Sequence, residues 1–362
     1  MTVTASFTAE QREMRSVLRA ALADASSVDT SHERVWQTLT GELGLAALLV
    51  PTKRDGLGLG PVELLVVAEE LGRALRAGDF LTTGVLGAAL LADLATAPAD
   101  DLLARLVTGR LRTAVLTDAV AEVAAGVPGQ RCPVTLGAGP VPGADQADIL
   151  LVPGRAGAQP VLVAVDPASS GVTLAPVPCL DDTRGFAAVT LAAATGTIVA
   201  AGDHLPDRLA QAMTLARLYL AGEAGGGASW CLEAATEYAT LRTQFGRPIG
   251  SFQAIKHLCA DLLVDVQGCK SMSRLAAAQV ETGAPEAALD VDLALLHAAG
   301  AFDRVARGAM HVFGGIGFTW EHPAHRYVKR ALTVASLLEP EDRVRARVAA
   351  RVHSRPPSPK EA

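Results

Sequence analysis

The segment RTQFGRPIGSFQ, residues 242–253, combines cationic, amide and aromatic side chains. They are Arg242, Gln244, Phe245, Arg247 and Gln253. A guanidinium group presents a fixed fork of N–H donors that matches the oxygens of a phosphate, and a helix N-terminus favours negative charge. Because a helical pattern opens at the end of this segment, these residue types predict a site for an anionic group. A capped helical hairpin with surface arginines is the alternative interpretation.

Two predicted helices flank this segment. Residues 222–241 are rich in alanine, leucine and glutamate and contain no proline, which favours a helix that Gly246 can end. Pro248 cannot continue that helix, and Ser251 is a suitable N-cap for the next one. Beyond it, apolar residues recur at helical spacing on one face: Phe252, Ile255, Cys259, Leu262, Leu263 and Val266. The sequence therefore predicts a helix, a tight break and a second, half-buried helix.

A glycine-rich turn, FGGIG at residues 313–317, follows a long amphipathic segment. A helix C-cap accounts for one of its glycines but not for three. The three glycines therefore indicate close approach of a backbone or a ligand. His322 and His325 stand just beyond this turn, but no cysteine or carboxylate completes a metal site with them, so we predict no metal.

The elements that would position these segments fall into three blocks. The first block reads as helical. The second contains short β-branched runs separated by Gly, Pro and Asp, which are typical of an antiparallel β domain. The third block again has helical patterns, and they are numerous enough to form a helical bundle. We therefore predict an α+β fold with an N-terminal helical domain at 1–110, a middle antiparallel β domain at 111–200, a C-terminal four-helix bundle at 201–354 and a flexible tail at 355–362.

Composition argues against several classes of function. The chain has 362 residues with a formal net charge of -6 and no extended basic stripe, which argues against a nucleic-acid partner. Hydrophobic residues make up 50% of the chain, but it contains no uninterrupted apolar stretch of ~20 residues, so we predict no membrane span. The N-terminus does not read as a signal peptide. The 5 cysteines are scattered without metal spacing, which favours a reducing cytoplasm.

The motifs described above resemble those of the acyl-CoA dehydrogenase family. Residues 242–253 are similar to the family signature R-x-Q-F-G-x-P-I-x-x-F-Q, and residues 311–331 resemble its C-terminal F-G-G-x-G motif. A third stretch, residues 43–75, is similar to the family's N-terminal region. The three stretches occur in the family's order, so the resemblance implies its fold of helices, β domain and helical bundle. Residues 315–322 further resemble short actinobacterial chains that act as the base-less subunit of mixed tetramers.

The resemblance implies an FAD-dependent oxidoreductase of lipid metabolism that removes two hydrogens from the α and β carbons of an acyl-CoA thioester. Electrons would pass to an electron-transfer flavoprotein or a similar acceptor. The family positions that contact the cofactor correspond to Arg242, Gln244, Phe245, Gln253, His311, Gly314 and Gly315. In the middle domain, Thr117 and Asp118 keep part of a flavin-contacting turn that otherwise lacks its small hydroxyl-bearing residues. In the family the bundle is also the tetramer core, where the glycine pair approaches the flavin of a neighbouring subunit.

The sequence assigns no catalytic base. The family reaction needs a carboxylate to remove the α proton. The usual spacing from Gly314 places Leu338 at that position, and a minority position on the first bundle helix falls near Ala216. Glu339 and Glu223 are the nearby carboxylates. Glu339 is one residue past the usual position, and a shift of one residue turns a side chain to another direction. Glu223 lies about two helical turns beyond the minority position.

Three functions remain open. The first is an enzyme subunit that shares a flavin site with a glutamate-bearing relative in a hetero-oligomer. The second is a self-sufficient dehydrogenase, in a homo-oligomer, that uses Glu339 as its base. The third is a flavin-free structural or binding subunit of such a complex, which the altered turn at Thr117 and Asp118 favours.

Overall fold

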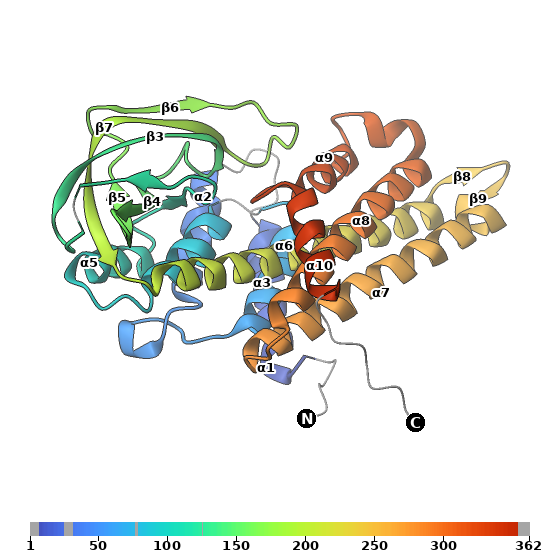
Figure 1. The fold of residues 1–362 in the computed structure, drawn as a ribbon. Coiled ribbons are helices and arrows are strands. Elements are labelled where there is room, and N and C mark those ends of the chain that lie inside the picture. The colour runs from blue at the N-terminus through green and yellow to red at the C-terminus, as the bar shows by residue number, and fades with distance from the viewer. Residues whose placement is uncertain (1–6, 25–31, 77–78, 125, 354–362) are drawn as a thin grey trace, which may run out of the picture.

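The computed structural model describes residues 7–24, 32–76, 79–124 and 126–353. Helices, a β domain and further helices follow one another along the chain (Figure 1), which confirms the predicted fold class. The tail predicted at 355–362 lies outside the described residues. Among the described helices, none combines the length and the apolar character needed to cross a bilayer.

The N-terminal block consists of helices packed around α3. Its helices are α1 (Ala9–Asp24), α2 (His32–Gln37), α3 (Pro61–Arg73), the π-helical η4 (Phe80–Gly87), α4 (Ala88–Leu91) and α5 (Ala97–Val107). Helix α3 is buried along most of its length because it packs against α1 and against α6 (Leu205–Leu241) of the third block. A glycine permits this close approach, since a Cβ atom on Gly72 would lie 2.0 Å from the Glu223 carbonyl oxygen.

The middle block is a single sheet with its own hydrophobic core. Its strands are β1 (Thr113–Val115), β2 (Ala121–Glu122), β3 (Arg131–Pro142), β4 (Ile149–Ala156), β5 (Gln159–Val165), β6 (Val172–Pro176) and β7 (Phe186–Ala201). The strand order is β1-β4-β5-β7-β3, with β2 also paired to β4 and β6 to β7. The pairs among β3 to β7 are antiparallel as predicted, whereas β1 and β2 both run parallel to β4.

The third block contains α6, α7 (Gln253–Glu281), α8 (Ala287–Phe313), α9 (Ala324–Val334) and α10 (Glu341–His353). The long helices α6, α7 and α8 pack against one another, and α9 and α10 both pack on α8 (Figure 1). Helix α6 is the most buried of them because it also contacts α3 and η4 of the N-terminal block. It therefore joins the two helical blocks into one continuous core.

The break between α6 and α7 differs from the predicted helix cap. Helix α6 ends at Leu241, before Gly246, and a hairpin of β8 (Thr243–Gln244) and β9 (Arg247–Pro248) follows. Phe245 and Gly246 form the turn of this hairpin with φ angles of 52° and 77°. A tight two-residue hairpin turn of this kind requires left-handed residues, which explains why Gly246 serves the turn and not the helix.

The start of α7 also differs from the prediction. Ser251 does not cap this helix; it lies in the short 3-10 helix η5 (Ile249–Ser251). Its hydroxyl group donates to the Pro248 carbonyl oxygen at 2.7 Å, so it is not available to an amide of α7. Further along α7, Leu262 is buried as predicted, but Leu263 is 47% exposed.

Candidate functional site

The hairpin and the glycine-rich turn lie at the same end of the bundle. Helices α6 and α8 run in the same direction with α7 returning between them along the chain, so their C-terminal ends meet (Figure 1). Tyr238 near the end of α6 contacts Phe313 at the end of α8, with ring centroids 5.4 Å apart. The fold therefore brings together two motifs that are distant in the sequence.

The residues predicted to bind a cofactor are exposed at this bundle end. They are Arg242, Gln244, Phe245, Gln253, His311, Gly314 and Gly315. Phe245 is 91% exposed, and the Arg242 guanidinium has no hydrogen-bond or ion-pair partner among the described residues. The Gln253 amide lies 3.0 Å from the His257 ring. The Gln244 amide nitrogen donates to the Thr243 carbonyl oxygen at 2.9 Å. Within one chain these residues form an open surface on which the Arg242 guanidinium is available to a ligand or to another subunit.

A cleft of about 720 Å³ lies elsewhere, between the middle sheet and the segment that joins α9 to α10. Thr117 and Asp118 line it from the sheet side, together with Phe186. Leu338 and Glu339 line it from the helical side. Thr117 and Asp118 belong to the turn that resembles a flavin-contacting turn, whereas none of the predicted cofactor-binding residues of the bundle end lines this cleft. The candidate site therefore has two separate parts, the cleft and the exposed bundle end.

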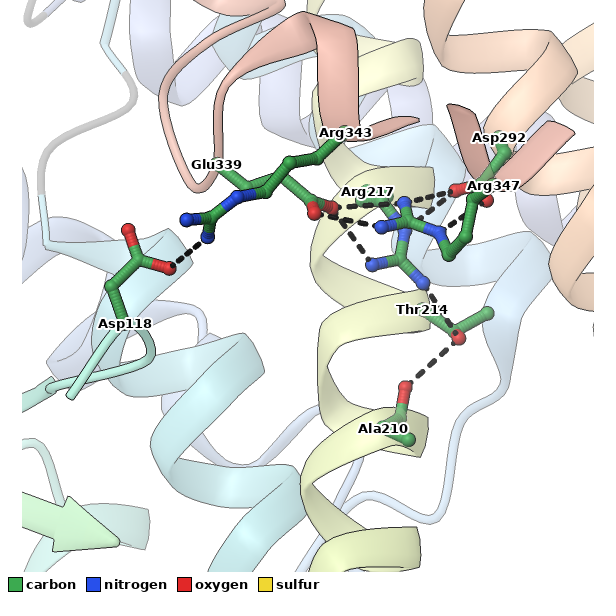
Figure 2. A network of polar contacts seen from close by, with 8 residues as sticks. All are labelled: Asp118, Ala210, Thr214, Arg217, Asp292, Glu339, Arg343 and Arg347. Carbon is green, nitrogen blue, oxygen red and sulfur yellow. Dashed lines mark hydrogen bonds and ion pairs between the residues drawn. The ribbon is translucent and has the colours of Figure 1, made fainter. Parts of the chain in front are cut away.

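The carboxylate nearest the expected base position is held by two arginines. Glu339 accepts hydrogen bonds from Arg347 Nη1 and Nη2 at 2.7 and 2.9 Å, and from Arg217 Nη1 at 3.2 Å (Figure 2). Partial burial would raise the pKa of Glu339, but the hydrogen bonds and charges of these guanidiniums lower it below the ordinary value. Leu338 beside it is buried and cannot accept a proton.

Asp292 of α8 completes this network, which we call the Glu339 network: Arg217, Asp292, Glu339 and Arg347. Arg347 donates to Asp292 through Nε at 2.9 Å and Nη2 at 3.0 Å, and Arg217 Nε lies 2.8 Å from the same carboxylate. The network ties the segment between α9 and α10 to α6, α8 and α10 (Figure 2). Nearby, Arg343 Nη1 lies 3.4 Å from Asp118 Oδ1 across the cleft.

Sequence reasoning missed Arg217, Asp292 and Arg347. A signal for Asp292 was present, because it falls at helical spacing with Leu289 and Leu295 on the buried face of α8. An acidic residue on an apolar face requires a cationic or hydrogen-bonding partner. The sequence did not indicate that the partners would come from α6 and α10.

The two histidines beyond the glycine-rich turn, His322 and His325, pack against aromatic side chains. Among the described residues no group of three His, Cys, Asp or Glu side chains is placed to hold a metal ion. The His322 ring instead packs beside Phe313, with centroids 4.2 Å apart, and His325 packs edge-on against Trp320 at 4.6 Å. Both histidines serve packing in this structure.

Comparison with known proteins gives matches over both helical blocks. The family model described as acyl-CoA dehydrogenase, N-terminal domain, matches residues 8–110, and the C-terminal domain model matches residues 207–352. The acyl-CoA dehydrogenase IpdE2 of Mycobacterium tuberculosis is 33% identical over 94% of this chain and 92% of the relative. Acyl-CoA dehydrogenase FadE34 of the same organism is 32% identical over 85% of this chain, which spans 40% of that longer relative.

Two solved structures resemble the whole fold. The ChsE4-ChsE5 complex from Mycobacterium tuberculosis contains a chain with a TM-score of 0.84 and 25% identity, covering 98% of this chain and 100% of that one. A chain of the Tcur3481-Tcur3483 steroid ACAD G363A variant has a TM-score of 0.81 and 26% identity, covering 95% of this chain and 98% of that one.

Proposed function

This chain belongs to the acyl-CoA dehydrogenase family of FAD-dependent oxidoreductases, and we propose that within an assembly of that kind it is the subunit without a catalytic base. The reaction is the α,β-dehydrogenation of an acyl-CoA thioester. A glutamate-bearing relative would supply the carboxylate that removes the α proton. This chain would contribute to the flavin site of that relative.

Leu338 carries this proposal. The usual family spacing places the base at this position, where the chain has a buried alkyl side chain. The minority position, Ala216, is also buried and apolar. Glu339 is the alternative base, but two guanidiniums already hold its carboxylate, and a lowered pKa weakens it as a proton acceptor. The self-sufficient dehydrogenase is therefore the weaker of the two enzyme hypotheses.

FAD is the cofactor of this family, and the donors at the bundle end fit an anionic dinucleotide. The free guanidinium of Arg242 suits a pyrophosphate, and the exposed amide of Gln244 adds hydrogen-bonding capacity. A Cβ atom added to Gly314 or Gly315 would meet no neighbouring atom within 4 Å. The backbone at these two glycines is therefore open to a ligand. When bound, the flavin accepts the hydride from the β carbon. The remaining proposed contacts are Phe245, Gln253 and His311.

A partner subunit and a reducing location are parts of the same proposal. The ChsE4-ChsE5 structure is a complex of two different chains, which supports a hetero-oligomer here. All the cysteines are free thiols, which supports the cytoplasm as the compartment. Electron-transfer flavoprotein or a similar acceptor would reoxidise the flavin.

Co-expression with a relative that carries glutamate at the position of Leu338 tests this proposal. We expect the two chains to purify together and to show the visible absorption spectrum of bound flavin. A flavin-free complex would instead favour the structural subunit, which the altered turn at Thr117 and Asp118 supports. A lack of any association would contradict the shared site.

A further inference from the structure

The loop that joins β6 to β7, residues 177–185, leaves the middle sheet and reaches α9 (Figure 1). Asp181 of this loop is 1% exposed, and Arg330 Nε of α9 contacts its carboxylate. Arg330 is also 1% exposed, and its Nη1 donates to Glu223 Oε1 of α6 at 2.6 Å. Arg184 of the loop contacts Glu223 as well. These four charged residues, which we call the buried cluster, tie the loop to two helices.

Stability alone does not account for the buried cluster. Replacing buried ion pairs by apolar residues of similar volume is often neutral or stabilising, because desolvation offsets the attraction between the charges. Burial would raise the pKa of Asp181 and of Glu223, but Arg330 and Arg184 lower both, so both carboxylates stay ionised. The best-attested use of buried charges is to select one packing register over another.

The loop sequence by itself leaves the register open. It contains two consecutive aspartates, Asp181 and Asp182, and either could bring a carboxylate to a buried cation. In the structure Asp181 is buried, whereas Asp182 is exposed and lines a separate polar cavity of about 460 Å³. A slip of one residue would exchange the two carboxylates and move every other side chain of the loop to its neighbour's place.

The guanidinium of Arg330 distinguishes these two registers. It donates through Nε to Asp181 and through Nη2 to the hydroxyl oxygen of Thr183. That hydroxyl group in turn donates to Asp181 Oδ1 at 2.5 Å. A slip that brought Asp182 to Arg330 would put Arg184 in the place of Thr183, so a second cation would face the guanidinium. The planar fork of an arginine therefore fits the observed register and disfavours the slipped one.

We propose that Arg330 is a positioning residue that fixes the register of the β6–β7 loop, with Glu223 holding its guanidinium in place. The register matters to the cleft, because Cys179 of the loop and Phe186 at its end line that cleft. The loop itself is neither helix nor strand, so no ladder of backbone hydrogen bonds fixes its position. The inference goes beyond the proposed function and holds whichever chain supplies the catalytic base.

A charge-balanced double variant, Arg330→Met with Glu223→Gln, tests this role. It leaves Asp181 and Arg184 as a pair 3.6 Å apart. The readout is the rate at which iodoacetamide labels Cys179, followed by mass spectrometry of its peptide. We expect Cys179 to react about tenfold faster in this variant, because the loop then opens locally without global unfolding. The urea midpoint should stay near that of the wild type.

Cys259 on α7 provides an internal reference, since its thiol is partly buried, as is that of Cys179. Its labelling rate should not change in the double variant. A matched control, Arg208→Met with Asp93→Asn, removes an ion pair outside the buried cluster and should leave both rates unchanged. A lower urea midpoint with faster labelling of both thiols would show that the buried cluster serves stability, which would overturn the proposal.

Arg330→Lys separates register from charge. Lysine keeps the positive charge but lacks the directed fork that contacts Asp181 and Thr183 together. We expect Cys179 in this variant to react as fast as in the double variant. Labelling at the wild-type rate in either variant would show that the guanidinium does not set the register of the loop.

Discussion

Arg217 Nη1 donates to Glu339 Oε1 at 3.2 Å. This contact joins the residues that follow Ala216 and Leu338, the two positions at which the resemblance to the family predicts a catalytic base. Those positions, Ala216 and Leu338, are both buried and apolar. The contact fixes the segment between α9 and α10 against α6. It also neutralises the one carboxylate next to Leu338, so the cleft keeps its shape without gaining a free base.

Glu339→Gln should lower the stability of the protein without lowering the activity of its assembled form. Of the anionic partners in the described part of the chain, the substitution leaves Arg217 and Arg347 with Asp292 alone. Loss of hydrogen bonds to charged groups typically costs about 1.5 to 3 kcal/mol, and urea unfolding would measure it. Glu341→Gln is the control, since Glu341 pairs with Arg345 on the surface and should contribute less than about 0.5 kcal/mol. Equal effects of the two changes would contradict a structural role of the Glu339 network.

The pH dependence of stability should change in the same variant. The pKa of Glu339 is lowered from its ordinary value of 4.5, so its charge stabilises the folded state above that value. This contribution is lost as the pH falls through the lowered pKa. The difference in unfolding free energy between wild type and Glu339→Gln should therefore be constant from about pH 6 to 8 and shrink below about pH 4.5. A difference that grows with acidification would show that Glu339 is not ionised in the folded protein.

The fold was predictable because apolar periodicity and Gly/Pro punctuation mark the three blocks directly. Each of the two motifs at the exposed bundle end was recognisable as well, since the residues within each motif are close together in the sequence, whereas their meeting depends on the packing of α6 and α8. The two ion networks were not. Glu223 and Arg330 stand 107 residues apart, and nothing in either segment indicates the other, because pairing depends on how α6 and α9 pack. The predicted cap at Ser251 failed because its hydroxyl satisfies the Pro248 carbonyl instead.

Arg242→Ala should weaken flavin retention by the assembled protein. Its guanidinium has no partner among the described residues, so removal costs the fold little. If it pairs with the pyrophosphate of FAD, the loss should be roughly 1.5 to 3 kcal/mol, which is about ten- to hundredfold in Kd. Flavin content and thermal melting should be compared with those of Arg307→Ala, an exposed arginine on α8 that pairs with Asp303 at 2.7 Å. Unchanged flavin occupancy in Arg242→Ala would remove this residue from the site.

The protein should form a closed oligomer. Three aromatic rings are strongly exposed near the bundle end: Phe245 at 91%, Phe318 at 73% and Trp320 at 72%. Apolar surface of this kind marks an interaction site, and association with closed symmetry would cover it. Light scattering at micromolar concentration should give a mass above that of one 37.3 kDa chain. The double variant Phe318→Ser with Trp320→Ser should form a smaller oligomer than the wild type. A wild-type protein that is monomeric would contradict a flavin site shared between subunits.

The purified chain alone should have little or no acyl-CoA dehydrogenase activity, whatever thioester is offered. An alkyl group at Leu338 cannot accept the α proton, and loss of a positioned base typically costs ~10²- to 10⁴-fold in rate. The assay uses an artificial electron acceptor with the isolated chain, its Glu339→Gln variant and a co-expressed pair with a glutamate-bearing relative. Activity that arises only in the pair and is indifferent to Glu339→Gln would support the base-less subunit. Turnover by the isolated chain that disappears in Glu339→Gln would make Glu339 the base, which requires that carboxylate to leave both Arg217 and Arg347 during the reaction.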